Sequence, residues 1–196
     1  VTVNLYASDD LGTALDTETT GPNGEYEFTG LTPGTYVVEF VNPDGTLWLS
    51  TPQDDGDTDL TDSDADPTTG YSQEITVVNG TDDSSIDAGF YQLAEVGDFV
   101  WTDTNGDGIQ DMDGTEPGLP GVAVTLFDEN GTQIDQVITG PNGAYLFTGL
   151  EPGDYAITVG DLPGYNYSPV NQGGNDAVDS DFPDGTTMVP VNLESG

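Results

Sequence analysis

The alternation of apolar and polar residues along the chain predicts an all-β protein. Short segments carry an apolar side chain at every second position, and no stretch keeps a helical period over three turns. In the first half, strands are predicted near Val1–Tyr6, Leu15–Thr19, Glu25–Phe28, Thr35–Phe40, Gln73–Val78 and Ser85–Tyr91. In the second half, they are predicted near Gly97–Trp101, Val122–Phe127, Gln133–Ile138, Ala144–Phe147, Asp154–Val159 and Thr186–Val191.

One face of each strand is expected to supply the core. Aromatic side chains dominate the cores of β-sandwiches, so the regularly spaced Tyr and Phe residues are assigned to the interior. In the first half the predicted core residues are Val3, Leu5, Tyr26, Phe28, Leu31, Tyr36, Val38 and Phe40. Their partners in the second half are Val124, Leu126, Tyr145, Phe147, Leu150, Tyr155, Ile157 and Val159.

The sequence repeats itself. The segment G-P-N-G-E-Y-E-F-T-G-L at 21–31 returns as G-P-N-G-A-Y-L-F-T-G-L at 140–150, and the strand at Val1 returns at Val122. Self-similarity at this spacing indicates two copies of one domain. We expect two tandem immunoglobulin-like β-sandwich domains, the first at 1–94 and the second at 95–196.

The two copies begin and end at different places. The first has no counterpart of the opening strand and acidic loop at 96–121, and the second has no counterpart of the segment 81–93. Either the sequence is a piece of a longer repeat array, or neighbouring chains exchange strands head to tail. The first interpretation is preferred, and in both cases the expected partners are neighbouring copies of the same domain.

Composition excludes several classes of function. The 196 residues include 37 acidic side chains and no Lys, Arg or His, which gives a formal charge of −37. Nothing in the chain neutralises nucleic-acid phosphates or anionic lipids, and no apolar run is long enough to insert into a membrane. Without Cys, His or Lys there is no disulfide, thiolate metal site or Ser–His couple. A carboxylate pair of the glycosidase type is the remaining catalytic option, and so many acids make that signal almost worthless, so we predict no enzyme.

The loop after Trp101 carries the most specific chemistry. Oxygen-bearing residues at spacing 1, 3 and 5 are followed by a glycine, a residue that offers a carbonyl at position 7, and an acid at position 9. This series matches the ligand order of a calcium loop. Position 12, where a bidentate Glu is expected, is Gly114, so Asp113, Glu116 or a water must close the shell. The candidate ligands are Asp103, Asn105, Asp107, Ile109, Asp111 and Glu116.

A second acidic cluster recurs in both copies. Asp62-Ser63-Asp64 in the first copy matches Asp179-Ser180-Asp181 in the second, although the surrounding residues differ. Two Asp residues at this spacing on an extended chain point the same way. The alternative is a solvated loop, which is what most charge runs are. We predict a second calcium site in each repeat, with Asp62, Asp64, Asp179 and Asp181 as ligands.

These motifs together resemble the B-repeat domain of serine–aspartate-repeat surface adhesins, within the collagen-adhesin B-type family. The resemblance rests on G-D-F-V-W-T-D-T-N-G-D-G-I-Q-D, the G-P-N-G hairpins, the D-S-D loops and S-I-D-A-G-F-Y. It implies a reverse-topology, immunoglobulin-like sandwich held by calcium and strung in tandem outside a cell. Related domains carry a Lys-based isopeptide bond, and a chain without Lys cannot form one.

Two functional hypotheses follow. The first is an extracellular structural repeat that forms a rigid, calcium-stabilised stalk or fibre of a cell-surface adhesin or filament. The second is a module that binds a carbohydrate or protein through calcium and exposed aromatic residues such as Trp48, Tyr165 and Tyr167. A cell-surface or secreted location suits both, because calcium and high salt relieve the repulsion of so many negative charges.

Overall fold

A computed structural model describes residues 1–43, 48–50, 63–80, 82–111, 113–175 and 177–195. The secondary structure of this described part consists of strands and turns, and it holds no helix that is long and apolar enough to span a membrane. The prediction of an all-β chain is therefore confirmed. Contacts between residues divide the chain into two compact units, Val1–Gln92 and Leu93–Gly196.

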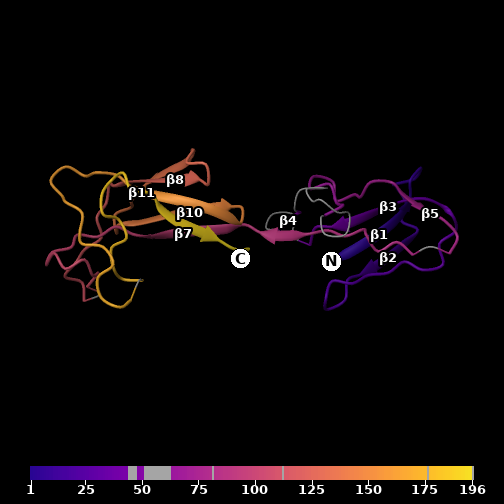
Figure 1. The fold of residues 1–196 in the computed structure, drawn as a ribbon, viewed down its shortest axis with the longest axis horizontal. Coiled ribbons are helices and arrows are strands. Elements are labelled where there is room, and N and C mark those ends of the chain that lie inside the picture. Colours follow the sequence, from indigo (N-terminus) through magenta and orange to yellow (C-terminus); the bar gives the residue numbers. More distant parts are fainter. Residues whose placement is uncertain (44–47, 51–62, 81, 112, 176, 196) are drawn as a thin grey trace. The chain divides into compact units, whose positions relative to one another are not determined.

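Unit 1 contains a four-stranded antiparallel sheet in the order β2-β1-β3-β5 and a two-stranded sheet of β4 and β6 (Figure 1). Its strands are β1 (Thr2–Ala7), β2 (Asp16–Thr19), β3 (Gly34–Val41), β4 (Trp48–Ser50), β5 (Ile75–Val77) and β6 (Phe90–Gln92). Strand β1 lies between β2 and β3, with Val3 opposite Glu18 on one side and Phe40 on the other. Strand β2 stands at one edge of the sheet, and all four of its residues are exposed.

Unit 2 repeats this four-stranded sheet in the order β12-β11-β8-β9, and β7 pairs with β10 in a second sheet. Its strands are β7 (Ala94–Phe99), β8 (Ala123–Asp128), β9 (Gln133–Ile138), β10 (Ala144–Leu150), β11 (Gly153–Val159) and β12 (Val189–Leu193). All of these pairs are antiparallel. Each sheet turns one face inward, so the unit resembles a β-sandwich.

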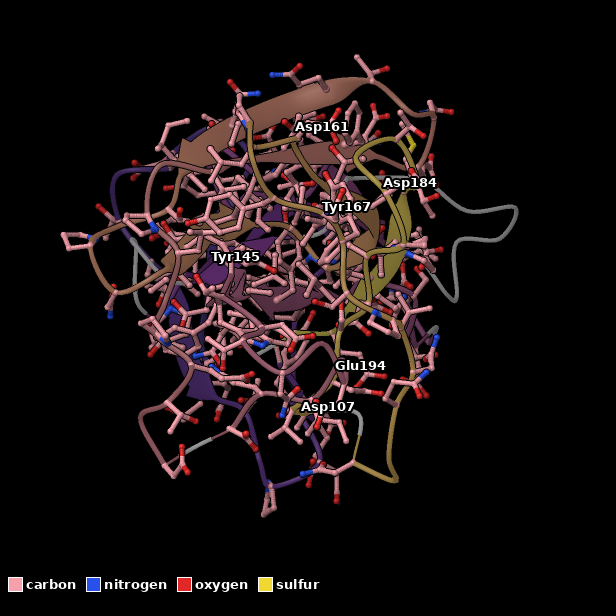
Figure 2. All side chains as sticks on the ribbon, turned by 90° about the vertical axis from the view of Figure 1, so that its left-hand side faces the viewer. Asp107, Tyr145, Asp161, Tyr167, Asp184 and Glu194 are labelled. Atoms are coloured by element: carbon pink, nitrogen blue, oxygen red, sulfur yellow. The ribbon has the colours of Figure 1, made fainter. Side chains whose placement is uncertain are left out.

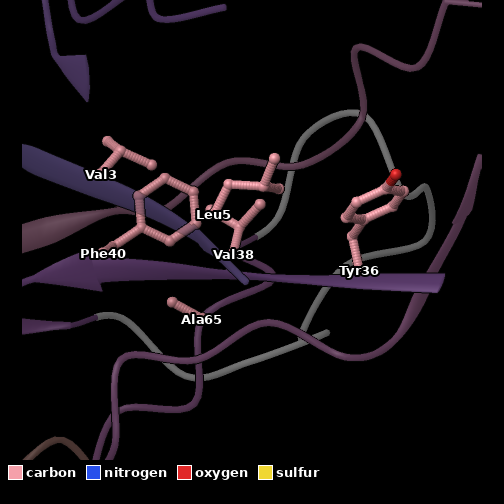
Figure 3. Close-up of a cluster of buried hydrophobic side chains, with 6 residues drawn as sticks. All are labelled: Val3, Leu5, Tyr36, Val38, Phe40 and Ala65. Atoms are coloured by element: carbon pink, nitrogen blue, oxygen red, sulfur yellow. The ribbon is translucent and has the colours of Figure 1, made fainter. Parts of the chain in front are cut away.

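Each unit has its own core. Alternate residues of β1 and β3 fill the first, where Val3, Leu5, Val38 and Phe40 pack with Tyr36 and Ala65 (Figure 3). Strands β8, β10 and β11 fill the second with Val124, Leu126, Phe147, Ile157 and Val159, together with Val122. Every predicted core residue belongs to one of these clusters or packs against it, so that prediction is confirmed. The sequence did not point to Ala65 or Val122.

The predicted strand Glu25–Phe28 is wrong, and a comparison of the two units shows the difference. Its counterpart in unit 2 is β10, whose backbone pairs with β7. Residues 25–28 form no such ladder among the described residues of unit 1. Tyr26 and Phe28 nevertheless pack against the core, with their ring centroids 5.6 Å apart. Burial of the aromatic side chains thus holds this segment without a ladder.

Two other predicted strands are displaced. Of Ser85–Tyr91, only the end enters a strand, because the preceding backbone bonds to side chains instead: Asp64 Oδ2 accepts the Asp87 N–H at 2.8 Å. Strand β12 begins at Val189 rather than Thr186. The N–H groups of Thr186 and Thr187 bond to Asp184, which forms a turn before the strand.

Candidate metal centre

The acidic loop of unit 2, residues 103–116, lies between β7 and β8, and its two ends are hydrogen-bonded to each other. Its two ends are tied by a bridge between Trp101 and Gly118 and by the Thr102 N–H, which donates to the Pro117 carbonyl at 2.9 Å. The Leu119 N–H donates to the Val100 carbonyl at 2.7 Å. Residues 103–116 therefore stand on a fixed base next to the core.

The side chains at alternate positions of this loop fold its backbone into successive turns. Asp103 accepts the N–H of Gly106 at 2.6 Å through Oδ1 and that of Gly108 at 2.9 Å through Oδ2. Asn105 Oδ1 accepts the Asp107 N–H at 2.8 Å, and Asp107 Oδ1 accepts the Ile109 N–H at 2.9 Å. The regular spacing seen in the sequence is thus a regular series of side-chain-to-backbone turns.

Glu116 joins the beginning of the loop to its far side. It is only 6% exposed, and its Oε1 accepts the Thr104 N–H while its Oε2 accepts the Asp111 N–H, both at 2.9 Å. Asp113, the other acid considered for closing the loop, instead bonds to the N–H and hydroxyl of Thr115. The structure therefore turns Glu116, and not Asp113, back into the loop.

The acids of the loop repel one another. Partial burial raises the pKa of Asp111, and the carboxylates of Glu116, Asp113, Asp107 and Asp103 raise it further. The Asn105 side-chain N–H₂ lies between two of these carboxylates, 3.0 Å from Asp107 Oδ2 and 3.4 Å from Asp111 Oδ2. A neutral amide, which carries no positive charge, thus lies between two negatively charged carboxylates.

The pKa of Asp103 is shifted in the opposite direction from that of Asp111. Partial burial acts to raise the pKa of Asp103, but hydrogen bonds from the Ser168 side chain and from the N–H groups of Gly108 and Gly106 outweigh it and lower the pKa. Asp103 is therefore held in its ionised form at the base of the loop. Nothing in the sequence around Ser168 marked it as a partner of the loop.

The D-S-D segment of unit 2 pairs with the acidic loop. Ile109 and Asp179 form an isolated antiparallel bridge. On either side of it, the Gln110 N–H donates to the Val178 carbonyl at 2.6 Å and the Ser180 N–H donates to the Gly108 carbonyl at 3.0 Å. The two acidic motifs, which are far apart in the sequence, therefore meet in one place.

The carboxylate of Asp179 is buried at this place. It is 9% exposed, and its Oδ1 is buried without a hydrogen-bond partner among the described residues. Asp103, Asp179 and the exposed Asp181 all line one cavity of about 460 Å³. A buried, unpaired carboxylate oxygen is costly unless a cation or donor reaches it.

The donor set is of the chemical type that calcium binds. It consists of oxygen atoms from carboxylates, an amide and backbone carbonyls, which are the ligands that Ca²⁺ takes. Within the described residues, however, no group of three or more acidic side chains converges as a metal cluster. Several of these side-chain oxygens, such as those of Asp103 and Glu116, accept hydrogen bonds from backbone N–H groups. A bound ion would compete with these N–H groups for the oxygens.

The D-S-D segment of unit 1 has a different environment. Asp62 lies outside the described residues, as do Asp54, Asp55, Asp57 and Asp59. Asp64 is 8% exposed; its N–H donates to the Asp87 carbonyl at 2.9 Å and its carboxylate accepts the Asp87 N–H. In unit 1 this carboxylate therefore anchors the segment 85–90.

One acid shortly after each D-S-D segment, Asp66 in unit 1 and Asp184 in unit 2, forms a turn. Asp66 accepts the N–H groups of Thr68 and Thr69, and Asp184 makes the same contacts with Thr186 and Thr187. These bonds occupy their carboxylates and lower the pKa of both acids. The repeat thus preserves an Asp-capped turn at this place in each copy.

The aromatic residues considered for ligand binding do not form a row in the described structure. Tyr165 is 50% exposed, whereas the Tyr167 hydroxyl donates to the Val159 carbonyl at 2.7 Å and its ring packs against the core. Figure 2 shows Tyr167 with Asp161 and Asp184 nearby and Asp107 in the acidic loop. Burial, and after it a hydrogen bond with Asp161, raises the pKa of Tyr167 to about 12. The side chain of Trp48 lies outside the described residues.

The fold and this loop define a class of acidic, all-β repeat domains. The family model of the SdrD B-like domain matches residues 1–90 and 94–196, so the chain belongs to the SdrD B-like domain family. The resemblance seen in the sequence is thereby confirmed. The family covers both halves of the internal repeat.

Relatives support this assignment. Serine-aspartate repeat-containing protein F of Staphylococcus epidermidis is 40% identical over 184 residues, which is 93% of this chain and 11% of that protein. Serine-aspartate repeat-containing protein D of Staphylococcus aureus (strain Newman) is 41% identical over 182 residues, 92% of this chain and 13% of that protein. The chain therefore spans only a small part of the length of these relatives.

Solved structures show a more distant likeness. The Bacillus anthracis TIE protein has a TM-score of 0.38 and 14% identity, and the match covers 100% of this chain and 28% of that one. The streptococcal ancillary pilin has a TM-score of 0.34 and 16% identity, with 100% and 54% covered.

Proposed function

We propose that this chain is part of the extracellular stalk or fibre of a cell-surface adhesin, and that calcium stabilises its structure. In this proposal the two units are tandem immunoglobulin-like sandwiches of reverse topology, and their neighbours are further copies of the same domain. Membership of the SdrD B-like domain family and the similarity to serine-aspartate repeat-containing proteins support it. The chain carries no catalytic role in this proposal.

The observation that carries the calcium part is the uncompensated negative charge around residues 103–116. Partial burial, and after it the neighbouring carboxylates, raises the pKa of Asp111, and Asp179 Oδ1 is buried beside the same loop without a hydrogen-bond partner among the described residues. The sequence has no Lys, Arg or His. No side chain of the chain can therefore neutralise these acids, and in this proposal a cation from solution does so.

Calcium would be held by the residues of the loop. Asp103, Asn105, Asp107, Asp111 and Glu116 would supply side-chain oxygens and Ile109 its carbonyl. Asp179 and Asp181 lie on the adjoining segment, and we propose that they serve a further ion, as Asp62 and Asp64 would in unit 1. The bound ion would supply positive charge to an acidic cluster that otherwise repels itself.

The position of the loop explains how an ion would stiffen the protein. Residues 108–110 form a short ladder with residues 178–180, and the base of the loop is tied to β7 and β8. An ion bound by the loop would oppose the separation of these segments. Ligand binding to the folded chain alone raises stability by mass action, about 2.7 kcal/mol at a calcium concentration 100 times the dissociation constant.

Thermal unfolding in calcium and in excess chelator tests this function. The Tm should be higher in calcium, and an equal concentration of Mg²⁺ should raise it less, because Mg²⁺ demands a smaller octahedral site. The variant Asp107→Asn should lose part of the calcium-dependent gain. Its matched control is Asp135→Asn, which removes one charge from the exposed strand β9. An identical Tm in calcium and in chelator would overturn the proposal.

A further inference from the structure

The two four-stranded sheets each have an edge strand in the same place, but the two edges differ in charge. Strand β2 is this edge in unit 1 and β9 is this edge in unit 2, and no strand of the described part pairs with the outer side of either. Glu18 of β2 lies opposite Val3. Its counterpart in the repeat is Val137 of β9, which lies opposite Val124. An acid in the first edge is thus replaced by an apolar residue in the second.

The backbone of β9 offers hydrogen-bonding groups along this outer side. The Thr139 N–H donates to the Val122 carbonyl at 2.9 Å, so residues 135 and 137 also direct their backbone groups toward β8. The N–H and C=O groups of Gln136 and Ile138 therefore point away from the sheet. The irregularity in the register of β9 lies before residue 135. Residues 135–139 thus form a regular edge, on which the Ile138 side chain is 60% exposed.

An antiparallel pairing of β9 with β9 of a second copy is self-complementary. With Val137 at the twofold axis, Gln136 lies opposite Ile138 of the second copy, and each such pair exchanges two backbone hydrogen bonds. Val137 then meets Val137 of the second copy at a position without hydrogen bonds, where Cα atoms are about 4.5 Å apart. Asp135 lies opposite Thr139 of the second copy, so no two acids face each other.

The matching pairing of β2 with itself would be unfavourable. Glu18 would lie opposite Glu18 of the second copy, and like charges directly opposite each other destabilise a strand pair. Asp16 and Glu18 make β2 acidic, whereas Asp135 is the only acid of β9. Each chain has a formal charge of −37, so two copies repel each other unless the surfaces in contact carry few acids. Of the two edges, β9 meets this condition.

We propose that β9 is a homophilic interaction site, where one copy of this chain joins a second copy by antiparallel pairing of residues 135–139. The second copy is the occupant because this edge is complementary to itself in its hydrogen-bonding groups, in its apolar contact and in the separation of its acids. The two four-stranded sheets become one continuous sheet, which links two chains side by side. This lateral contact goes beyond the proposed stalk, and it uses no residue of the proposed metal site.

Asp135 limits the strength of the contact. Its Oδ1 accepts the Gln136 N–H at 2.7 Å, and the same N–H must turn to the Ile138 carbonyl of the second copy when the strands pair. Unit 1 has the same arrangement on β2, where Asp16 Oδ1 accepts the Thr17 N–H at 2.9 Å. An acid that occupies an outward N–H of an edge strand opposes pairing with other chains. The contact between copies is therefore reversible and is strengthened when Asp135 is removed.

Single cysteines test the pairing, because the sequence has no Cys of its own. About 1 M NaCl shortens the Debye length to about 3 Å and so screens the repulsion between two acidic chains. In this salt and a mild thiol oxidant, Val137→Cys should form a disulfide-linked dimer, since a Cα separation of about 4.5 Å lies within the range of disulfides. Gln133→Cys, at the start of β9, is the matched control. The proposed register keeps its two copies far apart, so it should give at least about tenfold less dimer.

A second pair of variants tests the role of Asp135 by sedimentation equilibrium in the same salt. Asp135→Ala releases the Gln136 N–H and should tighten the dimer at least about fivefold, which is the value of one hydrogen bond. Asp16→Ala makes the same change on β2 and should leave the association unchanged, because Glu18 still opposes pairing there.

Three results would overturn the inference. The first is the absence of a disulfide-linked dimer of Val137→Cys. The second is equal cross-linking of Val137→Cys and Gln133→Cys, which would show contact without this register. The third is equal tightening by Asp135→Ala and Asp16→Ala, which would place the contact between copies away from β9.

Discussion

Ile109 and Asp179 face each other in an antiparallel bridge that joins the acidic loop to the D-S-D segment of unit 2. The bridge brings the buried carboxylate of Asp179 beside a loop that already carries several acids. Its two flanking hydrogen bonds use the carbonyl of Gly108 and the N–H of Gln110. The loop and the segment therefore form one structural element, and a change in either should disturb both.

Gly108 allows this close approach. Its φ is 78°, and a Cβ at this position would overlap the Pro169 carbonyl oxygen. Gly108→Ala should therefore destabilise the protein by more than the about 1–2 kcal/mol that a left-handed alanine costs. Urea unfolding in chelator measures the change. The matched control is Gly106→Ala, where φ is 77° and a Cβ meets nothing within 4 Å; equal losses for the two variants would contradict the explanation.

Much of this architecture could be predicted from the sequence, because it depends on local pattern. The alternation in β1 and β3 identified the core of unit 1, and the spacing from Asp103 to Asp111 identified the loop. The failures concern groups brought together by the fold. Glu25–Phe28 has the composition of a strand but forms no ladder among the described residues, and ladder formation depends on a neighbouring strand that no local pattern reveals. The pairing of Ile109 with Asp179 likewise depends on chain topology.

Glu116 should contribute to stability even without an ion. Its two oxygens accept the N–H groups of Thr104 and Asp111 from a buried position. Glu116→Gln replaces one acceptor oxygen by a donor N–H₂, which leaves one of those N–H groups without its partner. We expect a loss of about 1–3 kcal/mol in urea unfolding in chelator. Glu129→Gln, at an exposed position in a turn, is the control for the lost charge, and a similar effect of both variants would refute the role of Glu116.

Asp111 should have opposite effects with and without calcium. Burial and neighbouring carboxylates raise its pKa in the folded chain above the ordinary value, so ionised Asp111 destabilises the fold above that folded pKa. The destabilisation declines as the pH falls through this raised pKa, and it is gone below the ordinary value of 3.8. At neutral pH in chelator, Asp111→Asn should therefore raise the Tm, whereas in calcium it should reduce the gain from the ion.

The neighbouring acid Asp113 provides the control for Asp111. Hydrogen bonds from the Thr115 hydroxyl and N–H lower the pKa of Asp113, so its ionised form is favoured in the folded chain. Asp113→Asn removes one charge from the same loop but also weakens these bonds, and it should not raise the Tm in chelator. Scanning calorimetry in chelator compares the Tm of Asp111→Asn and of Asp113→Asn with that of the parent chain. A lower Tm for Asp111→Asn in chelator would show that repulsion does not dominate at this site.

Asp184 should titrate far below an ordinary aspartate. A hydrogen bond from the Thr186 hydroxyl, followed by the N–H groups of Thr186 and Thr187, lowers the pKa of Asp184 to about 2. Because the folded pKa lies below the ordinary value of 3.8, Asp184 stabilises the fold above that value, and this stability is lost as the pH falls toward about 2. Carbon-13 NMR of the carboxyl group should give a midpoint near 2 for the parent chain. Thr186→Ala should move the midpoint upward, whereas Thr148→Ala, at an exposed position in β10, should not. An unchanged midpoint in Thr186→Ala would mean that the backbone N–H groups alone hold the carboxylate.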